Sequence, residues 1–166
     1  MTFTLKGSPD RAKRSFVRAW LNAAMCVMEF HNRPVRRHIR VVFRKDLGDT
    51  ELGGRCAGRY WREWQPGIDL IQIRRDLSAE GLATTVVHEV IHACFGGFGA
   101  GTDEKCTSTL TARLKPATKV IAEELLLDMQ KRAAFVAHTK IAYRTTRGDH
   151  YDPAQHEKLG VKDRRS

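Results

Sequence analysis

The sequence predicts a small α+β domain, and three observations support this fold class. An N-terminal stretch has the apolar spacing of an amphipathic helix, three short central stretches have the composition of strands, and the second half again has helical spacing. A chain of 166 residues is long enough to bury one core. We therefore expect a single domain over residues 1–144 and a polar, mobile tail over residues 145–166, which lacks apolar periodicity.

The first predicted helix begins at Ser8-Pro9, because proline is well tolerated in a first helical turn, and it ends near Phe30. We expect this helix to cover the sheet. Its apolar side chains recur at helical spacing and would form the packing stripe: Phe16, Val17, Trp20, Leu21, Ala24, Val27 and Met28.

A short mixed sheet of about three strands is predicted next. Residues 39–44 place isoleucine, valine and phenylalanine at alternate positions, which is typical of a strand with one buried face. A second strand is expected over residues 58–64, after the loop around Gly53-Gly54. The third, over residues 68–73, comes immediately before the next helix.

That next helix, over residues 79–94 with Ser78 as N-cap, contains the sequence His-Glu-Val-Ile-His. Residues four apart lie on one face of a helix, so His88 and His92 can present two imidazoles to one metal ion. Glu89 would lie beside them, close enough to polarise a water on that metal. Two histidine ligands and a general base within one turn form the HExxH pattern of zinc metallopeptidases.

A catalytic zinc site needs a third protein ligand. The Gly-rich segment 96–101 ends the motif helix and lets the chain reverse, which can bring such a ligand back to the metal. No histidine follows His92 until His138, so the near candidates are Asp103 and Glu104. We favour Glu104, because Asp103 is also a candidate N-cap.

Two further helices are predicted after the Gly-rich segment. The first runs over residues 104–114 and is closed by Pro116. The second runs over residues 118–136. The first would bury a stripe of three side chains: Cys106, Leu110 and Leu114.

HEVIHA, the Gly-rich segment and DEKCTSTLTARLKP together resemble the gluzincins, in particular the compact ImmA/IrrE-type and phage-encoded zincin-like peptidases. In gluzincins a glutamate on a downstream helix is the third zinc ligand. The resemblance covers roughly residues 35–130. It implies a small zincin-like domain in which His88, His92 and Glu104 bind Zn²⁺ and Glu89 is the general base.

The resemblance also implies how a protein or peptide substrate binds and reacts. In zincins the strand before the motif helix commonly binds an extended peptide by adding it to the sheet edge. Glu89 would take a proton from a zinc-bound water and pass it to the leaving amine. The strand expected to line the substrate cleft supplies five residues: Asp69, Leu70, Ile71, Gln72 and Ile73.

Many zincins add a tyrosine or histidine that stabilises the oxyanion. Tyr143, His138 and His150 have suitable side chains, but they lie far along the chain from the motif. The sequence does not choose among them, and each could equally have a surface or packing role.

The net charge of +10 is concentrated near the N-terminus, since residues 1–45 carry +9 and the remainder carries +1. Arg36, His38, Arg40 and Arg44 share one parity on the first predicted strand, so they could form a basic stripe. Such a stripe would attract nucleic acid or an acidic partner. Alternatively, it is a solvated strand face on which charge prevents aggregation.

Two functions of different classes follow. One is a zinc metalloendopeptidase. The other is a basic nucleic-acid-associated protein whose zinc site is structural or degenerate. An intact Glu89 favours the enzyme, because a purely structural site needs ligands but no base.

The composition predicts a cytoplasmic protein without a membrane partner. No apolar stretch is long enough to cross a bilayer, and the N-terminus lacks a secretory pattern. Four cysteines without a CxxC pairing are expected to be reduced. Cys94 and Cys106 lie close enough in sequence to approach the metal, but we expect them to be small buried residues.

Overall fold

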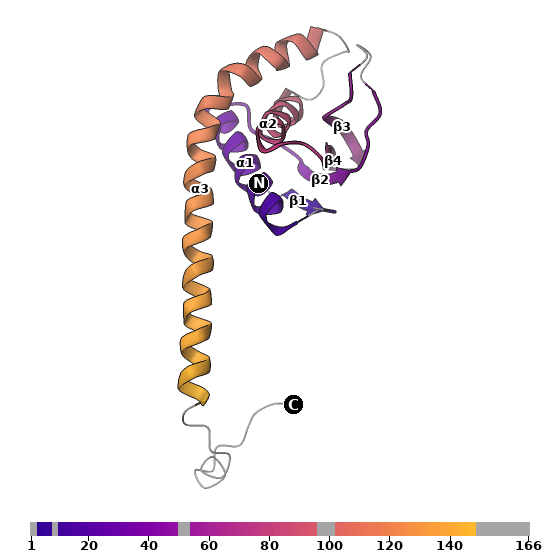
Figure 1. Cartoon of the computed structure of the whole chain (residues 1–166). Coiled ribbons are helices and arrows are strands. Elements are labelled where there is room, and N and C mark those ends of the chain that lie inside the picture. Colours follow the sequence, from indigo (N-terminus) through magenta and orange to yellow (C-terminus); the bar gives the residue numbers. More distant parts are fainter. Residues whose placement is uncertain (1–2, 8–9, 50–53, 96–101, 149–166) are drawn as a thin grey trace. The chain divides into compact units, whose positions relative to one another are not determined.

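The computed structural model describes residues 3–7, 10–49, 54–95 and 102–148, with side chains in the last range described for residues 104–137. Within these residues, three helices and a four-stranded mixed sheet confirm the α+β class. The elements follow one another along the chain (Figure 1) in the order β1 (Phe3–Lys6), α1 (Arg11–Phe30), β2 (His38–Arg44), β3 (Gly58–Gln65), β4 (Ile68–Arg74), α2 (Ala79–Phe95) and α3 (Thr102–Gly148).

The sheet has the strand order β1-β2-β4-β3. β2 pairs in parallel with β1 and β4, whereas β3 pairs antiparallel with β4. The three predicted strands are confirmed as β2, β3 and β4, but the expected number of about three was one too low. β1 was missed because its four residues are too few for an alternating pattern to stand out.

Helices α1 and α2 cover one face of the sheet (Figure 1). The core joins apolar side chains of both helices, such as Leu21 and Val90, to alternate side chains of β2 and β4, such as Val41 and Ile71. Successive side chains of a strand point to opposite faces. The side chains of β2 that alternate with the buried ones, such as Arg40, therefore lie on the face away from α1 and α2.

Helix α1 is capped by Asp10, whose Oδ1 accepts a hydrogen bond of 2.6 Å from the backbone N–H of Lys13. The predicted start at Ser8-Pro9 lies outside the described residues, and the helix begins at Arg11. Its predicted end near Phe30 is confirmed. The predicted packing stripe is buried apart from Phe16, which is partly buried.

Helix α3 corrects the prediction of two helices separated at Pro116. It continues through Pro116 to Gly148. An interior proline removes its own N–H from the helical ladder and its ring crowds the carbonyl one turn earlier, but packing on both sides can offset that cost. Here Leu114 and Thr118 lie against side chains of α1 and α2, and both Thr118 and Ala122 are fully buried. Leu110 and Leu114 are partly buried as expected, but Cys106 is exposed.

The chain divides into two compact units, Met1–Leu127 and Asp128–Ser166. The predicted domain end at residue 144 thus lies within the second unit. Of the predicted tail, residues 145–148 belong to α3 and the rest lies outside the described residues. None of the described helices has both the length and the apolar composition needed to cross a membrane.

Candidate metal centre

Helix α2 begins as predicted at the Ser78 cap. The Ser78 hydroxyl accepts a hydrogen bond of 3.1 Å from the backbone N–H of Gly81, and the Ser78 carbonyl accepts one of 2.8 Å from Leu82. The side of α2 opposite the histidines is apolar and buried at Ala83, Val87, Val90 and Ile91, and Cys94 is partly buried. This packing fixes the rotation of the helix about its axis and so decides where its histidines point.

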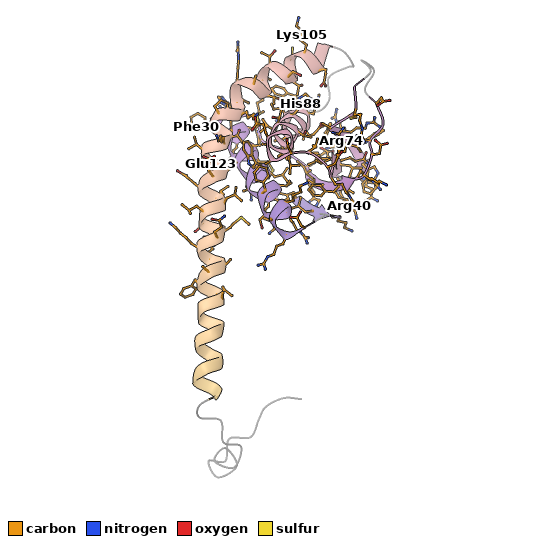
Figure 2. All side chains as sticks on the ribbon, in the orientation of Figure 1. Phe30, Arg40, Arg74, His88, Lys105 and Glu123 are labelled. Atoms are coloured by element: carbon orange, nitrogen blue, oxygen red, sulfur yellow. The ribbon has the colours of Figure 1, made fainter. Side chains whose placement is uncertain are left out.

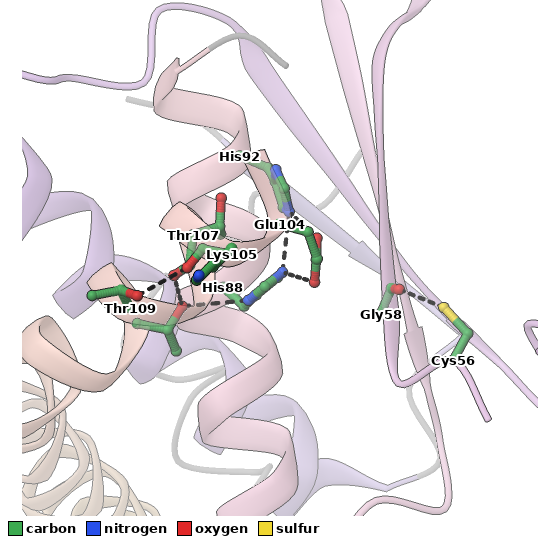
Figure 3. Close-up of polar contacts among 9 residues, drawn as sticks. Cys56, Gly58, His88, His92, Glu104, Lys105, Thr107 and Thr109 are labelled. Carbon is green, nitrogen blue, oxygen red and sulfur yellow. Dashed lines mark hydrogen bonds and ion pairs between the residues drawn. The ribbon is translucent and has the colours of Figure 1, made fainter. Parts of the chain in front are cut away.

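His88 and His92 point to the same place, where Glu104 of α3 meets them (Figure 3). The two Nε2 atoms are 3.0 Å apart. Oε1 of Glu104 lies 3.0 Å from Nε2 of His88, and Oε2 lies 3.3 Å from Nε2 of His92. The structure therefore brings together the three residues expected as ligands; the side chain of Asp103 lies outside the described residues.

These distances fit a tetrahedral zinc ion. Ligand atoms about 2.0–2.1 Å from zinc at tetrahedral angles lie about 3.3 Å from one another. Two imidazole nitrogens and one carboxylate are also a common donor set for catalytic zinc, which leaves a fourth position for water. The side chains of His88 and His92 are only 17% and 13% exposed, whereas Glu104 is 61% exposed, so the site opens to solvent on the Glu104 side.

The contacts of His88 favour the tautomer that a metal ligand requires. The Thr111 hydroxyl donates a hydrogen bond of 2.7 Å to the carbonyl of Thr107, so its oxygen can accept from Nδ1–H of His88, 3.4 Å away. With the proton on Nδ1, the lone pair of Nε2 faces Glu104 and His92. Thr111 is thus a supporting residue that the sequence analysis missed.

Glu89 is buried, with 4% of its surface exposed. The pKa of its carboxyl group is raised to about 8, mainly by burial and in smaller part by the Glu104 carboxylate, while Arg59 opposes both effects. A divalent cation held by the three ligands would lower that pKa again. A carboxyl group held out of bulk water beside a metal site has the environment of a general base.

Strand β3 approaches α2 closely at Gly58. A Cβ at this position would lie 2.4 Å from Oε1 of Glu89 and 2.4 Å from Cγ2 of Thr85, so only glycine fits without displacement. The thiol of Cys56 donates a hydrogen bond of 2.7 Å to the carbonyl of Gly58 (Figure 3). The sequence analysis gave Gly58 no role, because nothing local to β3 indicates the contact with Glu89.

Tyr60 of β3 also contacts the site. Its ring is nearly parallel to that of His92, with centroids 6.3 Å apart, and its hydroxyl donates a hydrogen bond of 2.8 Å to Oδ2 of Asp69. Asp69 is 2% exposed and also accepts a hydrogen bond of 2.9 Å from the backbone N–H of Glu63. Asp69 therefore holds β3, and Tyr60 with it, against the face of α2 that carries His88 and His92.

The prediction that residues 69–73 form a sheet edge for the substrate is wrong. Residues 69–73 belong to β4, which pairs with β2 on one side and with β3 on the other, so β4 offers no edge to a peptide. The residues expected to line the substrate cleft are correspondingly buried, except for Gln72, which is partly buried. Within the described residues, the sheet edge next to α2 is β3. The physical reason is that strand order depends on pairing between distant segments, which a motif does not reveal.

A cavity of about 300 Å³ lies close to His92, because Tyr60 lines the cavity and its ring also faces the His92 ring. Its charged lining consists of one acid, Asp69, and four arginines: Arg33, Arg36, Arg37 and Arg62. Arg37 is paired with Glu63 at 2.7 Å and lies 3.8 Å from Asp69. The cavity therefore carries a positive charge excess beside the candidate ligands.

Neither nearby cysteine belongs to the cluster of metal-binding groups found among the described residues. Cys94 is partly buried, and burial raises the pKa of its thiol to about 12. Cys106 is exposed, contrary to the expectation that it is buried. The side chains of His138 and Tyr143, and the whole of His150, lie outside the described residues, so the oxyanion candidates remain predictions.

We also compared the chain with protein families, curated proteins and solved structures. No model of a protein family, no curated protein and no solved structure matches the chain significantly.

Proposed function

We propose that this protein is a zinc-dependent endopeptidase of the gluzincin type that works in the cytoplasm. One observation carries the proposal: two imidazole nitrogens and a carboxylate converge at zinc-ligand spacing directly beside a buried glutamate. A cytoplasmic location fits the four free cysteines, because a reducing compartment keeps thiols unpaired.

His88, His92 and Glu104 would hold the metal. Zinc bound there supplies a Lewis acid that polarises a carbonyl group and lowers the pKa of water. Glu89 accepts the proton of the attacking water and returns it to the leaving amine. Its burial keeps competing solvent away from that proton, and Gly58 leaves the space in which the carboxyl group sits.

Strand β3 offers the substrate an edge. Its backbone pairs with β4 on one side only, within the described residues, so the other side can pair with an extended peptide. Main-chain pairing tolerates many sequences, so side-chain preference must come from elsewhere. The arginine-lined cavity next to His92 suits an acidic side chain of the substrate.

The test is zinc content together with peptide hydrolysis. Elemental mass spectrometry should find about one zinc per chain in wild type and much less in Glu104→Ala. Glu123→Ala is the matched control, because Glu123 is an exposed glutamate of the same helix that pairs with Lys119 instead. Glu89→Gln should keep its zinc and lose hydrolysis of a quenched fluorescent peptide library.

Two results would contradict the proposal. Wild type without zinc, even after supplementation, would make the cluster a chance arrangement of polar groups. Turnover retained in Glu89→Gln would remove Glu89 from the role of base.

A further inference from the structure

The face of the sheet away from α1 and α2 carries its own pattern of side chains. β2 alternates between the buried Ile39, Val41 and Phe43 and the outward-facing His38, Arg40, Val42 and Arg44. Register extends this face to the neighbouring strands, because Arg40 is paired with Leu70 and Leu70 with Trp61. We call it the open face and define it by its polar and aromatic residues, which surround the partly buried Val42 and the buried Leu70 of the same face: Lys6, His38, Arg40, Arg44, Arg59, Trp61, Trp64, Gln72 and Arg74.

The open face exposes two tryptophans. Trp61 is 47% exposed and Trp64 is 43% exposed. The Trp61 indole N–H lies 3.4 Å from the Gln72 side-chain oxygen, which holds its ring over the sheet. Large apolar side chains exposed together on one surface mark a binding site more often than a solvated face.

Cationic groups surround these rings. The guanidinium of Arg40 lies 5.1 Å from the centre of the Trp64 ring, and that of Arg59 lies 5.9 Å from the centre of the Trp61 ring. Arg40 and Arg74 are labelled in Figure 2. Arg74 pairs with Asp76, which follows β4, and its side chain is only 15% exposed, so the accessible cations of the open face are Lys6, Arg40, Arg44 and Arg59.

A partner for this surface must offer both negative charge and flat rings. An acidic protein supplies the charge and could bury the indoles at an interface, but its acidic side chains have no flat face that stacks on them. A nucleic-acid duplex supplies charge but hides its bases in the stack. A single strand offers phosphates to the cations and base faces to the indoles, and stacking of each base on an indole adds to the affinity.

We infer that the open face binds single-stranded nucleic acid, with bases stacked on Trp61 and Trp64 and phosphates contacted by the surrounding arginines and lysine. The surface lies on the opposite face of the sheet from α2, which carries His88 and His92. Binding there needs none of the three candidate metal ligands, so Glu104→Ala should bind as wild type does.

The test uses the full chain and fluorescently labelled oligothymidylate, with fluorescence anisotropy for affinity and intrinsic tryptophan fluorescence for stacking. The chain has three tryptophans, and Trp20 is buried at 5% exposure, so quenching by the oligonucleotide reports on Trp61 and Trp64. We expect quenching, affinity that falls steeply with added salt, and weaker binding of a duplex of the same length.

Replacing both open-face tryptophans with alanine should weaken binding at least about tenfold. Replacing both with phenylalanine should keep most of the affinity, because a phenyl ring still stacks. This variant distinguishes loss of stacking from loss of binding through misfolding. Arg40→Gln with Arg44→Gln should weaken binding and flatten the salt dependence. Two controls outside the open face should bind as wild type: Phe30→Ala, which removes an aromatic ring that is 84% exposed, and Arg18→Gln, which removes an exposed charge.

Three results would overturn the inference. One is no binding at low salt. Another is binding that causes no tryptophan quenching and is equally tight for a duplex or a polyglutamate peptide, which would indicate a general polyanion surface. The third is an equal loss of affinity in the Phe30→Ala control.

Discussion

The backbone of Gly58 lies so close to the carboxyl group of Glu89 that a single added carbon at residue 58 would fall 2.4 Å from Oε1. The edge strand and the proposed base are therefore in direct contact. Glu89 is enclosed by β3 on this side and takes its raised pKa mainly from that burial. The position of β3 thus controls both the proposed substrate edge and the environment of Glu89.

Gly58→Ala tests this contact. The new methyl group must displace either Glu89 or β3, so we expect a loss of about 1–3 kcal/mol in the free energy of unfolding. Hydrolysis should fall about a hundredfold through misplacement of the base, while zinc content remains. Denaturant titration and peptide hydrolysis measure the two effects.

Gly81→Ala is the matched control for that experiment. Gly81 lies in the first turns of α2, where a Cβ would come no closer than 3.3 Å to the Ser78 hydroxyl. Alanine there favours the helix but crowds the capping hydroxyl slightly, so stability should change by no more than about 1 kcal/mol in either direction. Wild-type stability and activity in Gly58→Ala would show that the contact with Glu89 has no consequence.

Thr111→Val tests the support of His88. The variant keeps the shape of the side chain but removes the oxygen that faces Nδ1, so the imidazole loses a partner that favours the ligand tautomer. We expect zinc affinity to fall about 10–100-fold, measured by competition with a chromogenic chelator. Thr109→Val should not change it, since Thr109 is exposed and its hydroxyl donates only to the carbonyl of Lys105.

Asp69→Ala tests the anchor of β3. The substitution leaves the hydroxyl of Tyr60 and the backbone N–H of Glu63 without their acceptor at a buried position. We expect the free energy of unfolding to drop by about 2–4 kcal/mol. Asp128→Ala provides the comparison, because that carboxylate is 52% exposed and pairs only with Arg132 one helical turn away. Equal, small losses in both variants would contradict an anchoring role for Asp69.

Arg36→Gln tests the charge of the cavity beside His92. Arg36 is an exposed residue that lines the cavity, so its charge should help to attract an acidic substrate side chain. The ratio of kcat/KM for acidic over neutral peptides should fall about threefold, in keeping with the modest strength of an exposed charge. Arg18→Gln should leave the ratio unchanged, and the same ratio in both variants would assign substrate preference to another part of the site.

Much of the candidate site could be predicted from the sequence because its chemistry is local. His88 and His92 are one helical turn apart, and the cap at Ser78 lies on the same helix. Glu104 was a reasoned choice between two neighbours, and a short return of the chain limited where a third ligand could come from. Thr111, Gly58 and Tyr60 could not be predicted in the same way, because each reaches the site from another element.

By itself, the sequence determined the fold class, the α2 helix with its two histidines, and the alternation of buried and exposed residues along β2. These features arise from caps and side-chain periodicity, which act over a few residues. Tertiary structure alone decided that β4 is an interior strand, that α3 continues through Pro116, and that Gly58 lies against Glu89. Each of these depends on pairing or packing between segments far apart in the chain, and such contacts leave no local pattern from which they could be predicted.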